Sequence, residues 1–157
     1  MPRYFEDLQP GDAFESPPRT VTAEEIVAFA REFDPQPFHV DPEAARGSFF
    51  GGLVASGWHT AALTMRNFVD AGVDLAGGII GAGMEYLRWP APLPAGDTIR
   101  TRITIERMRP SQSRPLFGIV TFRVETLRSD GKAVQEMSGN LIVPRRTDTG
   151  AGQPGRA

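Results

Sequence analysis

The spacing of hydrophobic positions changes about halfway along the chain. In residues 22–34 and again in residues 57–71, apolar side chains recur every three or four positions, which predicts two helices that each carry an apolar face. After Gly72 the apolar residues alternate with polar ones, as a half-buried strand requires. The change of period predicts a helical first half followed by a sheet. The predicted strands span residues 79–89, 98–107, 116–127 and 133–143.

The first predicted helix has clear limits. Thr22 and Glu25 fit a capping box at its start. Pro35 disfavours helical backbone for the residue before it, so the helix should end at Asp34. The next residues are stiffened by Pro35 and Pro37 and are predicted to form a defined loop.

The second predicted helix is apolar around most of its surface, and a helix of this kind is usually buried. We therefore expect an α+β domain in which the sheet curves around this helix. Short turns between consecutive strands predict an antiparallel meander. One domain is expected over residues 1–145, followed by a flexible tail over residues 146–157, which lack apolar periodicity. The main apolar stripe of the helix contains Trp58, Ala61, Ala62, Met65 and Val69, and Leu63 and Phe68 widen it.

Composition argues against several classes of function. The formal charge of −2 argues against a nucleic-acid-binding surface, and the absence of cysteine excludes disulfides, thiol catalysis and cysteine metal sites. The amino terminus lacks the layout of a secretion signal, and no apolar run approaches the length of about 18 residues that a bilayer span needs. We therefore expect a cytoplasmic protein that binds neither nucleic acid nor membrane.

Candidate chemistry is concentrated in residues 34–59, which hold both histidines of the chain. Asp34 and His39 can act as an acid/base pair, and Ser56-Gly57 opens the second helix, where free N–H groups suit an oxyanion. Taken alone, Asp34 is more simply interpreted as a turn carboxylate, and His39 as a hydrogen-bonded structural histidine, which is the commoner role of a lone histidine. An extended link would hold the two side chains about 16 Å apart, so their spacing in the sequence does not establish that they meet.

Other polar residues in this region have simpler interpretations. His59 is interpreted as a structural residue, and Ser56 as a helix N-cap or a hydrogen-bond donor near the ligand rather than a nucleophile. A metal site is not expected, because His39, His59 and Asp41 have no recognised ligand spacing.

Three segments together resemble a known family. Residues 34–45 read Asp-Pro-Gln-Pro-Phe-His-Val-Asp-Pro-Glu-Ala-Ala, with an aspartate five positions before a histidine. Residues 50–60 read Phe-Gly-Gly-Leu-Val-Ala-Ser-Gly-Trp-His-Thr, and residues 92–98 read Pro-Leu-Pro-Ala-Gly-Asp-Thr. In this order and spacing they resemble the hydratase motif, the approach to the central helix and the Pro-Gly-Asp turn of the MaoC-like, (R)-specific enoyl-CoA hydratase family.

The resemblance implies a hot-dog fold, in which an antiparallel sheet wraps a central helix. It also implies a homodimer or larger assembly and an acyl-CoA thioester as ligand. It identifies Asp34 and His39 with the catalytic pair, and Gly57, which follows Ser56, with the backbone N–H that binds the thioester oxygen. Gln36 stands where the family usually has asparagine and Ser56 where it often has histidine, which leaves the substrate class open.

The leading hypothesis is an enoyl-CoA hydratase, equivalently a 3-hydroxyacyl-CoA dehydratase, that adds water reversibly to a 2-enoyl thioester. This reaction needs no metal or organic cofactor. Two alternatives stay open at the level of sequence: a hot-dog acyl-CoA thioesterase, and a non-catalytic acyl-CoA-binding module. An intact acid/base pair argues against the second, because a pure binding module needs neither group.

Overall fold

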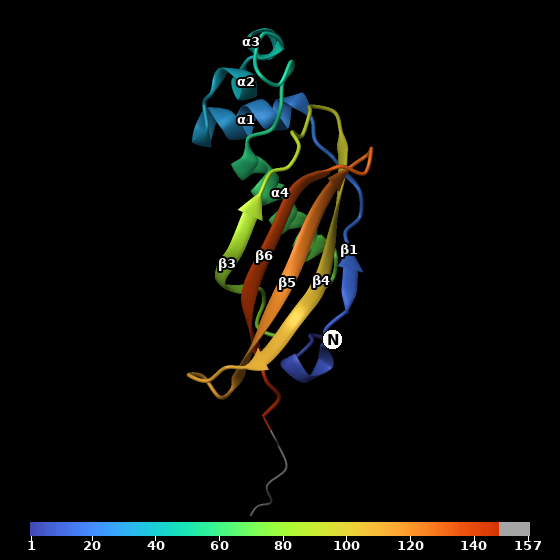
Figure 1. The fold of residues 1–157 in the computed structure, drawn as a ribbon, viewed down its shortest axis with the longest axis vertical. Coiled ribbons are helices and arrows are strands. Elements are labelled where there is room, and N and C mark those ends of the chain that lie inside the picture. The colour runs from blue at the N-terminus through green and yellow to red at the C-terminus, as the bar shows by residue number, and fades with distance from the viewer. Residues whose placement is uncertain (148–157) are drawn as a thin grey trace, which may run out of the picture.

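The structure, a computed structural model that describes residues 1–147, consists of one antiparallel sheet, a long helix against one face of it, and a group of shorter helices at one end (Figure 1). Residues 148–157, which make up most of the predicted tail, lie outside the described residues. The helices are η1 (Phe5–Asp7), α1 (Ala23–Phe33), α2 (Pro37–Val40), α3 (Pro42–Arg46) and α4 (Gly57–Asp70). The strands are β1 (Ala13–Glu15), β2 (Arg19–Thr20), β3 (Ile80–Arg88), β4 (Thr98–Pro110), β5 (Phe117–Arg128) and β6 (Ala133–Pro144).

The order of the strands in the sheet is β1-β4-β5-β6-β3, with β2 also paired to β4. The predicted meander is confirmed for β4, β5 and β6 but is wrong for β3, which pairs with β6 instead of the next strand in the chain. The reason is the connection between β3 and β4, residues 89–97. It contains three prolines, which have no N–H to donate, and it crosses the start of α4 by pairing with residues 53–55.

The strand patterns are confirmed by burial. Ile99, Thr101, Ile103 and Ile105 are buried along β4, while the arginines between them face solvent. Side chains of successive strand residues point to opposite faces, so this alternation puts one face of the sheet against α4 and leaves the other face exposed to solvent.

The first helix has the predicted limits. The hydroxyl of Thr22 accepts a hydrogen bond from the Glu25 N–H, and the Glu25 carboxylate accepts one from the Thr22 N–H. Asp34 follows as the C-cap residue. The predicted loop after it is wrong in part, because Pro37 begins the short helix α2, which carries His39. Proline is well suited to the first position of a helix, where its missing N–H would have no partner.

The predicted burial of the main apolar stripe of α4 is wrong within a single chain, whereas Leu63 and Phe68, which were expected to widen the stripe, are buried. Trp58, Met65 and Val69 of the expected apolar stripe are 59%, 44% and 56% exposed. The buried side of the helix is instead largely polar, and it consists of His59, Thr60, Leu63, Thr64, Asn67 and Phe68. Tertiary packing has overridden the periodicity that the sequence displays.

Two apolar clusters form the core. One surrounds Phe68, Ile103 and Phe122 toward the carboxyl end of α4. The other, near α1, contains Ile26, Leu63 and other aliphatic side chains. None of the helices within residues 1–147 is long and apolar enough to cross a membrane.

Candidate active site

Asp34 and His39 meet at the end of the molecule where α1, α2 and α4 come together. The His39 Nε2 atom lies 3.5 Å from Asp34 Oδ2, and both side chains are largely buried. Helix α2 makes this possible, because its turn shortens the link that an extended chain would stretch. The structure therefore brings together the two residues that the sequence motif singled out.

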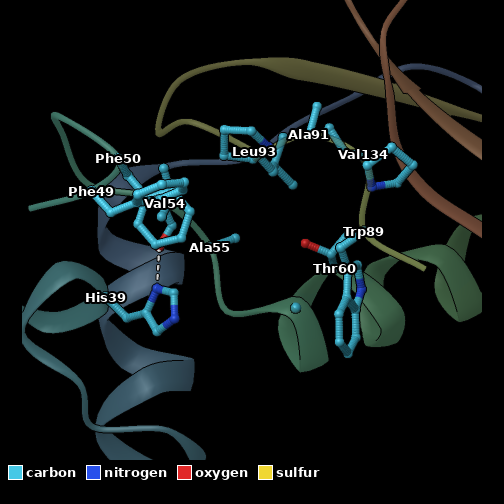
Figure 2. A pocket seen from close by; sticks show the side chains of 13 residues that line it. His39, Phe49, Phe50, Val54, Ala55, Thr60, Trp89, Ala91, Leu93 and Val134 are labelled. Atoms are coloured by element: carbon cyan, nitrogen blue, oxygen red, sulfur yellow. Dashed lines mark hydrogen bonds between the residues drawn. The ribbon is translucent and has the colours of Figure 1, made fainter. Parts of the chain in front are cut away.

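The orientation of the His39 ring is set by one backbone group. Its Nδ1 atom lies 2.7 Å from the carbonyl oxygen of Val54, shown as the dashed line in Figure 2. A carbonyl oxygen only accepts hydrogen bonds, so Nδ1 carries the proton and donates it. In the neutral imidazole the lone pair is then on Nε2, the atom that faces Asp34.

Asp34 accepts hydrogen bonds on both carboxylate oxygens. The Ser56 hydroxyl donates to Oδ2 over 2.6 Å, and the Gln36 amide donates to Oδ1 over 2.7 Å. Burial alone would raise the pKa of Asp34, but the hydrogen bonds from Ser56 and Gln36, with His39 nearby, outweigh it and hold that pKa below its ordinary value. Asp34 is therefore ionised at neutral pH.

Ser56 joins Asp34 to the start of α4. It is fully buried, and its hydroxyl oxygen also accepts a hydrogen bond of 3.3 Å from the Trp58 N–H, which makes it the N-cap predicted from the sequence. The hydroxyl points to Asp34, and Ser56 is not among the residues that line the adjacent pocket. Its position is that of a residue that holds the carboxylate in place.

A pocket of about 420 Å³ lies beside this pair, and both His39 and Gly57 line it. His39 and Trp89 stand on opposite sides of it in Figure 2, and the Thr60 hydroxyl points toward its interior. Asp34 is in contact with His39 but does not itself line the pocket. Most of the wall is apolar, with Phe50, Val54, Ala55, Leu93 and Val134 among its residues.

Gly57 has no room for a side chain. A Cβ atom on Gly57 would lie 2.7 Å from Cε2 of Trp89, so the indole packs directly on the glycine. The indole is held in turn by a 3.0 Å hydrogen bond from its Nε1 to Gln135 Oε1. As the first residue of α4, Gly57 has an N–H without a partner inside the helix, at the positive end of the helix dipole.

Comparison with known proteins shows the family to which the chain belongs. The family model described as "MaoC like domain" matches residues 7–126. The chain belongs to the MaoC-like dehydratase family. The protein MaoC of Klebsiella aerogenes is 42% identical over 106 residues, which cover 67% of this chain and 31% of that protein. The chain thus spans about a third of the length of that relative.

Two relatives of similar size extend the MaoC-like likeness over nearly the whole chain. An (R)-specific enoyl-CoA hydratase of Rhodospirillum rubrum is 31% identical over 148 residues, covering 91% of this chain and 93% of that protein. The crystal structure of a MaoC-like dehydratase from the same organism has a TM-score of 0.88 at 52% identity, covering 92% of this chain and 99% of the other. An (R)-hydratase from Pseudomonas aeruginosa, 19% identical with a TM-score of 0.75 over 98% of this chain and 96% of the other, supports the hot-dog fold.

Several pocket residues of this MaoC-like domain were not found from the sequence. Trp89 and the residues that follow it belong to the connection between β3 and β4, which was expected to be a simple turn. The three prolines in residues 89–97 were the available sign of a rigid connection. Thr60 was missed because a buried threonine has no distinctive spacing.

His59 lies away from the pocket. Its ring is buried and stacks on Phe29 of α1, with 4.6 Å between the ring centres and an angle of 9° between the planes. Its Nδ1 atom has no hydrogen-bond partner within the described residues. Burial lowers the pKa of His59, with Glu25 opposing and Arg19 adding to the effect. No group of three or more histidine, aspartate or glutamate side chains within residues 1–147 is arranged to hold a metal ion.

Proposed function

We propose that this chain is an enoyl-CoA hydratase, equivalently a 3-hydroxyacyl-CoA dehydratase, with Asp34 and His39 as its catalytic pair. The observation that carries the proposal is the Asp34–His39 contact beside a pocket that also contains Gly57. The MaoC-like family and the (R)-specific hydratase among its relatives support it.

The pair supplies the proton transfers of hydration. The oxygen of a water molecule forms a bond to C3 of the enoyl thioester while one of its protons passes to the Asp34–His39 pair. The electrons of the C2=C3 bond move toward C1, and negative charge develops on the thioester oxygen. A proton from the pair then bonds to C2, so the pair ends in its initial charge state. Dehydration is the reverse sequence.

The Gly57 N–H is the proposed donor to the thioester oxygen. A donor fixed at a helix start needs no reorganisation as the charge develops, and one such donor is commonly worth about 10²–10³ in rate. These steps use a carboxylate, an imidazole and a backbone amide, and no metal or organic cofactor takes part.

Substitution of the pair tests the proposal. When purified protein is given crotonyl-CoA or longer or branched 2-enoyl-CoAs, the absorbance of the conjugated thioester should fall as the double bond is hydrated. Asp34→Asn and His39→Gln should each lower the rate by about 10²–10⁴. Matched controls are Asp41→Asn, which keeps a good cap for α3, and His59→Gln, which changes the histidine outside the pocket. Near-normal turnover in either variant of the pair would reject the assignment.

The same experiment separates the two alternatives. Release of free thiol from a saturated acyl-CoA would identify a thioesterase. Tight binding of CoA esters without turnover of any enoyl substrate would identify a binding module. The Asp34–His39 contact argues against a binding module, which needs no acid/base pair, and the (R)-specific enoyl-CoA hydratase among the relatives favours hydration over hydrolysis.

We also propose that two copies of the chain form a homodimer. Among the described residues 1–147, strand β3 is the last strand at its edge of the sheet, and Ile80 and Met84 on it are 40% and 58% exposed. Together with Trp58, Met65 and Val69 of α4 they leave apolar side chains uncovered, and an exposed apolar patch beside a free strand edge is an interaction surface. A second copy presenting the same surface would cover both features.

A further inference from the structure

A layer of polar side chains separates the two apolar clusters of the core. On β4, Thr101 lies between Ile99 of one cluster and Ile103 of the other. On α4, Thr64 and Asn67 face this layer, and Thr126 of β5 completes it. All four polar side chains are at most 2% exposed. Burial of hydroxyl and amide groups is costly unless each one is hydrogen-bonded.

The hydrogen bonds in this layer run in one direction. Thr64 donates to the Thr60 carbonyl over 2.8 Å, because a carbonyl only accepts. The Thr64 hydroxyl has then used its proton, so Thr126 must donate to it over 2.7 Å. By the same reasoning Thr101 donates to Thr126 over 2.9 Å, and the Asn67 amide donates to Thr101 over 3.1 Å.

This hydroxyl chain, Asn67–Thr101–Thr126–Thr64, fixes the rotation and axial position of α4. Apolar contacts are non-directional and tolerate some repacking, whereas a turn of the helix here would leave buried polar groups unpaired. The chain ends at the Thr60 carbonyl, one turn from Ser56, and the Thr60 hydroxyl is 3.3 Å from the Ser56 carbonyl. The hydroxyl chain therefore holds the amino-terminal end of α4, which is the end that lies in the site.

We propose that the hydroxyl chain is a positioning device for the reaction: it sets the rotation of α4 so that the Gly57 N–H faces the pocket and Ser56 reaches Asp34. This inference rests on the proposed function. The residues act through α4 and touch neither the thioester nor the acid/base pair, so they are positioning residues.

Thr126 is the residue to change, because it links strand and helix. Thr126→Val keeps the shape of the side chain and breaks both hydroxyl bonds, whereas Thr126→Ser keeps the hydroxyl. The matched control is Thr121→Val on the same strand. The Thr121 side chain is buried and donates a 2.7 Å hydrogen bond to Asn140 of β6, so its loss has a similar effect on stability without touching α4.

Two readouts are needed. In the first, kcat should fall about 10- to 100-fold in Thr126→Val with KM little changed, as expected for a displaced catalytic group, and Thr126→Ser should restore it. The second readout is spectroscopic and does not depend on catalytic activity. The only two tryptophans of the chain, Trp58 and Trp89, are packed edge to face, with 5.3 Å between their rings, at the start of α4. Near-ultraviolet circular dichroism of this pair therefore reports a rotation of the helix.

The results separate the possibilities. A changed tryptophan signal with reduced kcat in Thr126→Val, absent in Thr121→Val, supports the proposal. Equal effects of the two valine variants on both readouts would overturn it, as would a changed signal with unaltered kcat. If the wild-type chain hydrates no enoyl thioester, the proposed function fails. The tryptophan signal then still decides whether the hydroxyl chain sets the placement of α4.

Discussion

The hydrogen bond between Ser56 and Asp34 joins three elements of the site, and its removal can be predicted in detail. Ser56→Ala deletes two interactions: the 2.6 Å bond to the Asp34 carboxylate and the 3.3 Å cap bond from the Trp58 N–H. A hydrogen bond to a charged, partly buried group contributes about 1.5–3 kcal/mol, and a long cap bond about 0.5 kcal/mol. We expect the free energy of unfolding at pH 7 to fall by about 2–3 kcal/mol.

The loss should depend on pH. The pKa of Asp34 is lowered in the folded protein, so the ionised carboxylate contributes stability that is complete above its unfolded pKa of about 4 and is lost as the pH falls through the folded pKa. Without Ser56, burial opposes ionisation with less compensation, so this pKa rises and the contribution shrinks. The difference in free energy of unfolding between wild type and Ser56→Ala should therefore become smaller below about pH 4. It should approach the contribution of the helix-cap hydrogen bond alone.

Urea unfolding followed by far-ultraviolet circular dichroism, at one fixed protein concentration, measures both effects. The control is Ser129→Ala, because the Ser129 hydroxyl also bonds a carboxylate, Asp97, over 2.5 Å, but on an exposed turn. The free energy of unfolding of Ser129→Ala should be lower than that of wild type by no more than about 0.5–1 kcal/mol. A loss below about 1 kcal/mol in Ser56→Ala, or one that is equal at neutral and acid pH, would refute the reasoning.

Three further predictions follow from other parts of the structure. Gly57→Ala should lower stability by about 1–3 kcal/mol and reduce turnover, because the new Cβ would lie 2.7 Å from the Trp89 indole; unfolding and rate measurements unchanged from wild type would contradict the contact. The pKa of His59 is lowered by burial, so stability should fall as the pH drops below about 6.5, and His59→Phe should flatten this dependence in thermal unfolding; equal pH profiles would show that this histidine is not the cause. Met65→Glu and Val69→Glu should each shift the chain from dimer to monomer in sedimentation analysis, because each puts a charge on the exposed apolar face, and an unchanged dimer would move the interface elsewhere.

The sequence alone determined the local structure well. The capping box of Thr22 and Glu25 marked the start of α1, and the alternating residues of β4 and β5 marked strands with one buried face. These features depend on neighbouring residues and on the fixed period of each backbone conformation, so a single chain displays them. The motif of Asp34 and His39 gave the candidate site by resemblance, but its spacing in the sequence did not bring the two side chains together.

Only the tertiary structure decided how the pieces meet. The turn of α2 brings His39 to Asp34, and the crossing of residues 89–97 places Trp89 on Gly57. The structure also reversed the expected burial of the main stripe of α4. Thr64 and Asn67 are hydrogen-bonded to Thr126 of β5 and Thr101 of β4, which lie far away in the sequence, and the apolar side chains of Trp58, Met65 and Val69 are left exposed within a single chain. Periodicity shows that a helix has two faces, but which face is buried depends on the hydrogen-bond partners and apolar surfaces that the rest of the fold brings to it.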